Sequence, residues 1–398
     1  MEWATEYPPP TRGVVVVWGL LASYPFGGMT WQVLHHLAGF RQLGFDVWYV
    51  EDTERPVLDP ESLSPTVEYE ANLNYLAEYM ERIGLADRWI FRPPGQTRSC
   101  LGARDYNGLR QLYRKADAVF NVCGAQEFRP EHEVIQRLVY LETDPAATQV
   151  AVACGDEEVI SELDRYHFLF TYGENIGAAD CRVPVTRYAW HPTRPPVCAD
   201  WWYSRAAPLA GAALTTIANW KHAGKDVVWN GETWRWSKHH EFLRFVDLPA
   251  KSKLPLELAV GAISQEECAE LRRRGWRLWP TISLEDPLKY RQYIQESLGE
   301  FTAAKEQVVR PRSGWFSDRS VCYLAAGRPV ITQETGFSRV IPTGEGLLAV
   351  STFAEAEEAV AAVAANYGRH AQAAREIALE YFDARRVLGK IAATLGLL

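Results

Sequence analysis

The chain has 398 residues, of which 47% are hydrophobic, and a formal net charge of −8 at pH 7. That length predicts two domains, and the acidic balance argues against a nucleic-acid surface, which would need a basic stripe. The longest apolar run, Val14 to Ala22, is too short to span a bilayer and lacks the pattern of a secretory signal, so we expect a soluble cytoplasmic protein.

The first half of the chain has the pattern of a parallel α/β sheet. After a proline-rich opening that ends near Arg12, residues 13–18 are a β-branched run typical of a buried strand. A glycine turn, Gly27-Gly28, leads into a helical pattern at 30–44, and a strand is expected at 47–51. Further helices are expected at 69–83 and 106–115, and further strands at 118–122, 137–141, 149–153 and 167–172.

A second α/β series follows a proline-rich segment at 191–199. This segment reads HPTRPPVCA, and its three prolines favour a linker over a regular element. Strands are then expected at 214–218, 256–259, 276–279 and 329–332, and helices at 238–245, 265–274, 288–298 and 318–326. A short helical segment is expected at 297–305, an alanine-rich helix at 355–365 and one long helix at 370–395.

A polar loop at 317–320, with the sequence SDRS, runs directly into the helix expected at 318–326. The start of a helix offers unpaired backbone N–H groups and the positive end of the helix dipole, and both attract phosphate. Arg319 would add a forked donor that suits phosphate, with Ser317 and Ser320 beside it. Asp318 would bind a sugar or ribose hydroxyl, although Ser317 or Asp318 could instead cap the helix.

A second polar turn, Thr335-Gly336-Phe337, follows the strand expected at 329–332. Together with AAGRPV at 325–330 and GEGLL at 344–348, this turn resembles the donor-binding segment of the retaining nucleotide-sugar glycosyltransferases with the GT-B fold. That family usually carries two glutamates in this region, and Gly314 and Cys322 occupy the corresponding positions here.

The resemblance implies an α/β protein with two Rossmann-like domains that face each other across a cleft. It implies an N-terminal acceptor domain at 1–190, a linker at 191–203, a nucleotide-sugar domain at 204–370, and a helix at 371–398 that returns to the N-terminal domain. The implied activity is metal-independent transfer of a hexose from a nucleotide-diphosphate sugar, the co-substrate, to a small acceptor. No cofactor, nucleic acid or integral membrane segment is expected.

The resemblance also places residues in the donor site. Gly27 and Gly28 would face the diphosphate, although they could equally form a tight strand-to-helix turn. Thr335, Gly336 and Phe337 would contact the donor sugar through backbone amides, or form an ordinary β-turn.

A lysine after the first strand of the second domain would bind the diphosphate, if it is not simply a surface residue. Lys225 fits the spacing better than Lys221, and Glu300 and Lys305 are further donor-side candidates.

Candidate catalytic residues are the carboxylates Glu142, Asp144 and Asp318. Glu142 and Asp144 follow the strand expected at 137–141, where a carboxylate could deprotonate an acceptor hydroxyl if the mechanism inverts the sugar configuration. Asp144-Pro145 is also a common turn signal. No metal site is expected, because no H-E-x-x-H or His/Cys ligand spacing occurs.

Two other functions stay open. A nucleotide-sugar 2-epimerase would use the same donor pocket without an acceptor, and a catalytically silent binding or assembly protein is compatible with the two missing glutamates. Fifteen tryptophans favour an aromatic or hydrophobic acceptor, such as a natural-product core. The donor sugar and its base, the stereochemistry and the oligomeric state are left open.

Overall fold

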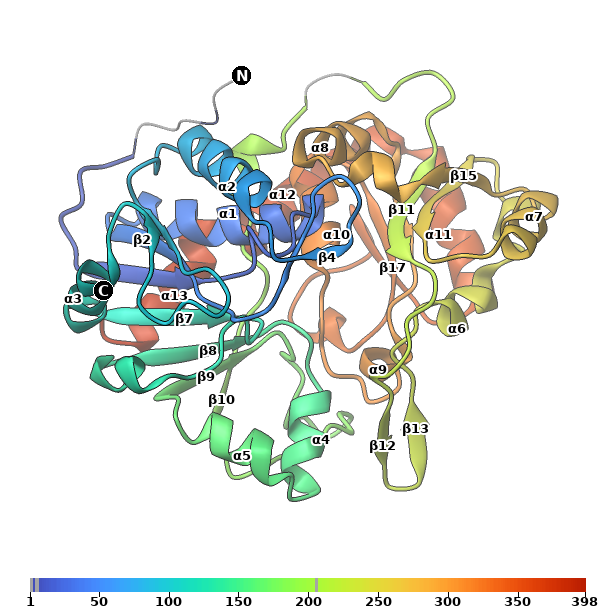
Figure 1. The fold of residues 1–398 in the computed structure, drawn as a ribbon. Helices are drawn as coiled ribbons and strands as arrows, with labels where there is room; N and C mark the ends of the chain where they lie inside the picture. The colour runs from blue at the N-terminus through green and yellow to red at the C-terminus, as the bar shows by residue number, and fades with distance from the viewer. Residues whose placement is uncertain (1–2, 4–6, 205–206) are drawn as a thin grey trace.

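The computed structural model describes residue 3, residues 7–204 and residues 207–398, apart from the side chains of residues 282 and 283 (Figure 1). Residues 1–2 and 4–6 of the expected irregular opening, and residues 205–206 at the start of the expected second domain, lie outside the described residues. Within these described ranges, most strands belong to two large sheets that lie side by side, as the sequence predicts.

The first sheet, on the left in Figure 1, has the spatial order β10-β9-β8-β7-β1-β2-β5-β6. All of its neighbouring strands are parallel except β5 and β6. The central strand β1 is buried from Val15 to Trp18, as expected of a strand covered on both faces. The strands are β1 (Val14–Trp18), β2 (Asp46–Glu51), β5 (Trp89–Phe91), β6 (Leu101–Gly102), β7 (Ala118–Val122), β8 (Leu138–Glu142), β9 (Phe168–Thr171) and β10 (Trp190–Pro192).

The helices of this half include one that the sequence pattern assigned wrongly. Residues 149–153, expected as a strand, belong to a helix whose start is held by the Gln149 side chain, which accepts a hydrogen bond from the Ala146 N–H at 2.8 Å. The alternating valines resembled a strand, but this side-chain contact and the alanines favour a helix. The helices are α1 (Gly27–Gln42), α2 (Glu70–Arg82), α3 (Tyr106–Lys115), α4 (Ala147–Ala153) and α5 (Glu157–Leu163).

The second sheet has the order β15-β14-β11-β16-β17-β18, and all its neighbouring strands are parallel. Residues 297–305, expected to be helical, contain the buried strand β16 instead. The strand pattern is hard to recognise because the strand includes a charged residue, Glu300, which forms a buried ion pair with Arg319. The strands are β11 (Leu214–Asn219), β14 (Leu256–Gly261), β15 (Arg277–Pro280), β16 (Gly299–Thr302), β17 (Val330–Gln333) and β18 (Leu347–Val350). The helices are α6 (His239–Phe242), α7 (Gln265–Arg273), α8 (Pro287–Glu296), α9 (Glu306–Val309), α10 (Asp318–Ala325), α11 (Phe353–Ala365) and α12 (Tyr367–Ile377).

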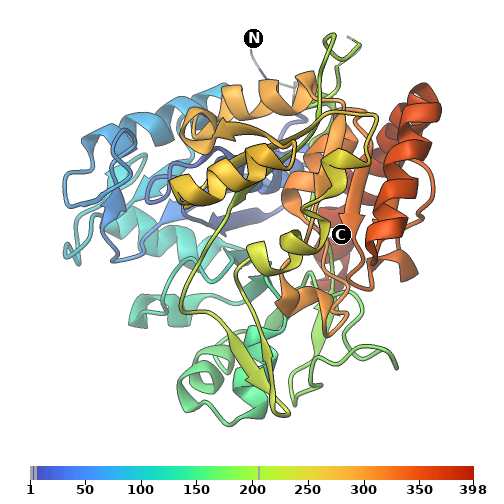
Figure 2. The ribbon, with the colours of Figure 1, turned by 90° about the vertical axis from the view of Figure 1, so that its right-hand side faces the viewer.

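A hairpin of the second half reaches across to the first. Its strands, β12 (Val227–Trp229) and β13 (Glu232–Trp234), project towards α4 in both ribbon views (Figures 1 and 2). Trp234 is fully buried there against Ala146, Val150 and Val183. The two halves are therefore joined by packing as well as by the chain. A smaller pair of strands, β3 (Val57–Leu58) and β4 (Pro65–Thr66), lies in the loop after β2.

The end of the chain returns to the first half, as expected. The last helix, α13 (Ala384–Thr394), packs against α1 at Gly39, where an added Cβ would lie 2.8 Å from the Cβ of Ala384. The prediction of a single helix at 370–395 is wrong, because the helix is interrupted between α12 and α13. Asp383 leaves the helical conformation and caps α13 by accepting a hydrogen bond from the Arg385 N–H at 3.1 Å.

The expected linker begins inside the first sheet, since β10 pairs in parallel with β9. The domain boundaries themselves stay predictions.

Tryptophans pack together where the segment after β10 crosses α1. The ring centroid of Trp31 lies 4.7 Å from the ring centroids of both Trp3 and Trp202. Among the helices that the structure describes, none is both long and apolar enough to cross a membrane.

Candidate functional site

An interdomain cavity of about 440 Å³ lies between the two halves of the protein. The first turn of one helix from each half lines it: Gly27 and Gly28 begin α1, and Asp318 and Arg319 begin α10. Backbone N–H groups in the first turn have no partner within the helix, and the helix dipole is positive there. Two helix starts at one cavity favour a bound anion.

The start of α10 is not closed by a side chain. Ser317 occupies the N-cap position and lines the cavity, but its side chain makes no capping hydrogen bond. The hydroxyl of Ser320, one turn further on, is buried without a hydrogen-bond partner among the described residues. The sequence allowed Ser317 either to cap the helix or to bind a ligand. The structure shows that Ser317 does not cap the helix.

Arg319 is held by the protein at the wall of the cavity. Its Nε donates to Glu300 Oε1 at 2.5 Å, Nη1 to the carbonyl of Ile217 at 2.7 Å, and Nη2 to Thr302 Oγ1 at 3.0 Å. A guanidinium has five N–H groups, so two stay available to a ligand. The fully buried carboxylate of Glu300 balances most of the charge of Arg319. Arg319 therefore anchors α10 to the protein as well as lining the cavity.

Two lysines add positive charge to the same cavity. Lys305 Nζ lies 2.7 Å from Asp144 Oδ1 of the first half and 3.2 Å from the centroid of the Trp236 ring. Lys238 Nζ lies 3.4 Å from Thr302 Oγ1. Burial lowers the pKa of both lysines; the charge of Arg319 lowers that of Lys238 further, whereas Asp144 acts against the shift in Lys305. Sequence reasoning missed Lys238, because no motif distinguishes it from an exposed lysine.

Asp318 is the carboxylate of α10 that faces the cavity. Burial raises the pKa of Asp318 to about 7, with the charge of Asp144 acting in the same direction and a hydrogen bond from Gln32 against it. Cys322, one turn further along α10, also lines the cavity. Burial raises the pKa of its thiol well above the usual value, so this position carries a neutral group where the resembled family has a glutamate.

A second cavity of about 400 Å³, which we call the β8 cavity, adjoins the first. Glu142 and Asp144, at the end of β8, line it together with Lys225 and Trp236 of the second half. Trp236 also lines the interdomain cavity, so the two cavities share this residue. Burial raises the pKa of Glu142 to about 7, although hydrogen bonds from Thr171, Gln149 and Thr148 oppose the shift. The structure thus places Glu142 and Lys225 beside, and not in, the interdomain cavity.

The two glycines of the first turn have different surroundings. A Cβ on Gly27 would lie 2.6 Å from the carbonyl oxygen of Leu284 and 3.0 Å from Cβ of Tyr290, both in the second half. A Cβ on Gly28 would lie 3.7 Å from its nearest neighbour, the hydroxyl of Tyr290. Gly27 therefore permits the close approach of the two halves at the cavity edge.

Glu51 orders the loop between β1 and α1 by accepting hydrogen bonds from the N–H groups of Ala22 and Ser23 at 2.8 and 2.6 Å.

Thr335, Gly336 and Phe337 line neither of these two cavities. Gly336, at φ 103°, packs against Asn175 of the first half, and Phe337 is buried against Phe316. Their role at the donor sugar stays a prediction.

Gly314 stands where the resembled family has its first glutamate. Its φ is 84°, and a Cβ added there would lie 2.3 Å from the backbone nitrogen of Asn175. No glutamate fits at this position.

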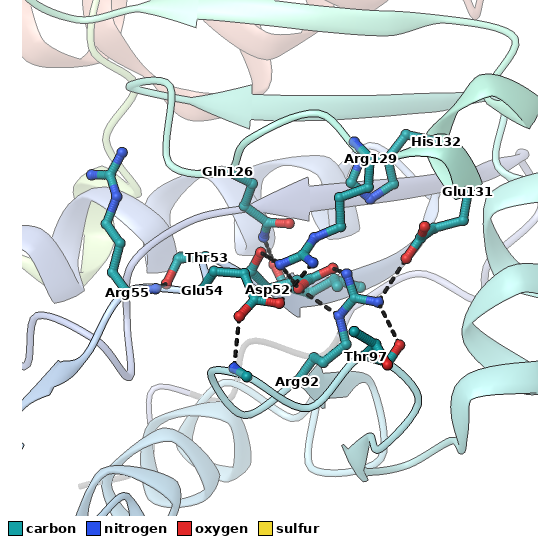
Figure 3. A network of polar contacts seen from close by, with 12 residues as sticks. Asp52, Thr53, Glu54, Arg55, Arg92, Thr97, Gln126, Arg129, Glu131 and His132 are labelled. Carbon is teal, nitrogen blue, oxygen red and sulfur yellow. Dashed lines mark hydrogen bonds and ion pairs between the residues drawn. The ribbon is translucent and has the colours of Figure 1, made fainter. Parts of the chain in front are cut away.

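A buried ion-pair network fixes the loops that follow β2, β5 and β7 in the first sheet (Figure 3). Arg92 pairs with Asp52 at 2.5 Å and with Glu131 at 2.6 Å, and Arg129 pairs with Asp52 at 2.8 Å and with Glu54 at 2.7 Å. Burial raises the pKa of Asp52 to about 6, and its two arginines oppose the shift. These charges pair with each other, so we assign the network a structural role.

Across the described residues, no group of three or more His, Cys, Asp or Glu side chains is arranged to hold a metal ion. Metal-independent chemistry stays a prediction.

Neither a protein-family model nor a curated protein matches the chain. Solved structures match it over nearly its whole length. An alpha-glucosyltransferase in complex with UDP and a 13-mer DNA superposes with a TM-score of 0.57 at 10% identity, covering 97% of this chain and 100% of that one. HepE from Anabaena, in complex with UDP and glucose, has a TM-score of 0.55 at 12% identity, with 97% and 100% covered. AviGT4, a glycosyltransferase involved in avilamycin A biosynthesis, has a TM-score of 0.52 at 14% identity, with 96% and 97% covered.

Proposed function

We propose that this chain, which has the GT-B fold of these glycosyltransferases, transfers a sugar from a nucleoside-diphosphate sugar to a hydroxyl-bearing acceptor. The observation that carries the proposal is the interdomain cavity, where the starts of α1 and α10 meet Lys238, Lys305 and Arg319. The diphosphate of the donor would lie there. Structural neighbours with bound UDP or UDP-glucose support a uridine nucleotide as the first candidate.

The electrostatics of the cavity support a bound anion. Burial lowers the pKa of Lys238 most and the charge of Arg319 lowers it further, while Glu300 and Asp144 act against the shift. A diphosphate would add negative charge beside Lys238 and return the pKa of this lysine towards its ordinary value. The same charges would stabilise the leaving diphosphate during transfer.

The proposed reaction joins the acceptor oxygen to the anomeric carbon as the bond from that carbon to the diphosphate breaks. The electron pair of the broken bond leaves with the diphosphate. The proton of the acceptor hydroxyl passes to Asp144, which the diphosphate would release from Lys305 by competing for its charge. Asp318, with its raised pKa, would hydrogen-bond the donor sugar. The stereochemistry stays open, since neither glutamate of the resembled family is present.

A small-molecule acceptor is the expected class, and the likeness to a natural-product enzyme supports it. Three of the matching structures are alpha-glucosyltransferase complexes with DNA, but the net charge of −8 gives this chain no general affinity for a polyanion. Epimerisation without an acceptor and binding without turnover are the competing functions.

A thermal-shift screen of nucleosides, nucleoside diphosphates and nucleotide sugars tests the proposal. A ligand that binds only the folded protein must raise the melting temperature. At least one nucleoside diphosphate and its sugar should do so, and the matching nucleoside should have a much smaller effect. No shift with any diphosphate would overturn the proposal. Turnover of a nucleotide sugar to an epimer without an acceptor would favour the epimerase.

A further inference from the structure

We propose that the β8 cavity binds the acceptor, and that this acceptor is a carbohydrate or a similarly hydroxyl-rich molecule. This inference rests on the proposed function. It replaces the expectation of an aromatic acceptor, for which the tryptophan count gives no support: nine of the fifteen tryptophans are buried.

The β8 cavity is placed where an acceptor must be. It shares Trp236 with the interdomain cavity, and Asp144, which lines it, forms the ion pair with Lys305 of the interdomain cavity. Cys123 also lines the β8 cavity, and its thiol lies 3.2 Å from Oε1 of Gln32, which lines the interdomain cavity. A molecule in the β8 cavity would therefore adjoin a donor held next to Lys305.

Glu142 makes the β8 cavity a polar binding site. Glu142 is 3% exposed, and the hydrogen bonds to its carboxylate from Thr171 Oγ1 at 2.6 Å and Gln149 Nε2 at 2.8 Å both go to Oε2. Oε1 is buried without a hydrogen bond of good geometry from the described residues, although the Thr148 hydroxyl is near enough to stabilise the carboxylate. A buried oxygen without a well-formed hydrogen bond is destabilising. A ligand hydroxyl that donates to Oε1 would remove that cost.

The other lining groups also suit hydroxyls. Thr148 and Asp144 can accept hydrogen bonds from a ligand, and Lys225 can donate them. The aromatic side chain that both cavities share, Trp236, already has Lys305 at 3.2 Å and Lys225 at 4.9 Å from its ring centroid. A flat aromatic acceptor would have to displace these charges and leave the carboxylates unpaired, whereas a polyol can pair with both.

The test measures UDP release from a mixture of UDP-sugars, with methyl glycosides of common hexoses as one set of acceptors and simple phenols as the other. At least one methyl glycoside should raise UDP release over the acceptor-free rate, and no phenol should match it. Glu142→Gln should lower the glycoside-dependent rate at least about tenfold, the value of one hydrogen bond to a charged group. It should leave the affinity for UDP within about twofold, because Glu142 lies outside the interdomain cavity.

Glu127→Gln is the matched control, since Glu127 is an exposed carboxylate that follows β7 and lines neither cavity. Stimulation by phenols alone, no stimulation by any glycoside, or an unchanged rate in Glu142→Gln would overturn the inference while UDP binding still supports the proposed function. Failure of every nucleoside diphosphate to bind the wild-type protein would overturn both.

Discussion

Lys238 and Lys305 are the residues on which the proposed diphosphate site depends most. Each is partly buried, and that burial lowers the pKa of each. Lys305 is already balanced by Asp144, whereas Lys238 contacts a neutral hydroxyl, Thr302. Lys238 is therefore the group that gains most from an incoming anion.

Lys238→Met should weaken UDP binding at least about tenfold, because a hydrogen bond to a charged group contributes about 1.5–3 kcal/mol. Binding of uridine should change little. Isothermal titration calorimetry at fixed salt measures both affinities. Lys221→Met is the control, since Lys221 is half-exposed and pairs with Glu267 at 2.9 Å outside the cavity. Equal losses for UDP and uridine would contradict a phosphate contact.

Arg319→Ala should lower the free energy of unfolding by about 3–5 kcal/mol, because it leaves the buried carboxylate of Glu300 without its partner. Urea denaturation measures the change. Arg339→Ala is the matched control: its pair with Asp180, at 3.3 Å, is exposed and should contribute about 0–1 kcal/mol. If both variants lose the same small amount, Arg319 is not the anchor that its contacts indicate.

Glu142 should make stability depend on pH. Its pKa is raised in the folded protein to about 7 from an ordinary value of 4.5. The folded state therefore binds the proton more tightly, so the contribution is complete below pH 4.5 and is lost as the pH rises to about 7. Glu142→Gln cannot titrate at this position, so its stability does not fall with the ionisation of this residue. The free energy of unfolding of Glu142→Gln relative to wild type should therefore rise by about 2–3 kcal/mol between pH 4.5 and about pH 7. Urea denaturation at several pH values measures the difference, and a pH-independent difference would contradict the shift.

At the scale of elements, the starts of α1 and α10 bring the two halves of the site together. α1 approaches α8 and the segment before it at Gly27, and α10 is tied to β11 and β16 through Arg319. The hairpin β12–β13 adds a further link by burying Trp234 against α4. The geometry of the cavity thus depends on contacts between helices and loops of different halves.

Gly27→Ala should destabilise the protein by about 1–3 kcal/mol, because its Cβ would meet the Leu284 carbonyl oxygen at 2.6 Å and force the halves apart. Gly28→Ala should have little effect on stability, since its Cβ has only ordinary contacts. Comparing the two melting temperatures checks this difference. If Gly28→Ala proves the more damaging substitution, the close approach at Gly27 is not what requires glycine.

At the scale of the whole molecule, much of the fold could be predicted from local patterns. The strands β1 and β7 and the helix α3 follow directly from β-branched runs and helical periodicity. α4 and β16 could not be predicted, because a side-chain contact at Ala146 decides the first and a buried Arg319–Glu300 pair the second.

The site was predictable only where a motif marks it. The turns at Gly27 and at 317–320 are sequence signals, and the fold brings them to one cavity. Lys238 carries no signal, since its burial depends on neighbours distant in the sequence, such as Thr302. The turn at 335–337 was assigned to the donor sugar by resemblance; Gly336 contacts Asn175, and the role of the turn stays a prediction.

Calorimetric titration of the wild-type protein with UDP and, separately, with uridine tests most directly whether the interdomain cavity is a diphosphate site. At least two charged contacts should distinguish the ligands, so UDP should bind at least about 100-fold more tightly than uridine. Equal affinities for the two ligands, or no binding of UDP at all, would contradict the account.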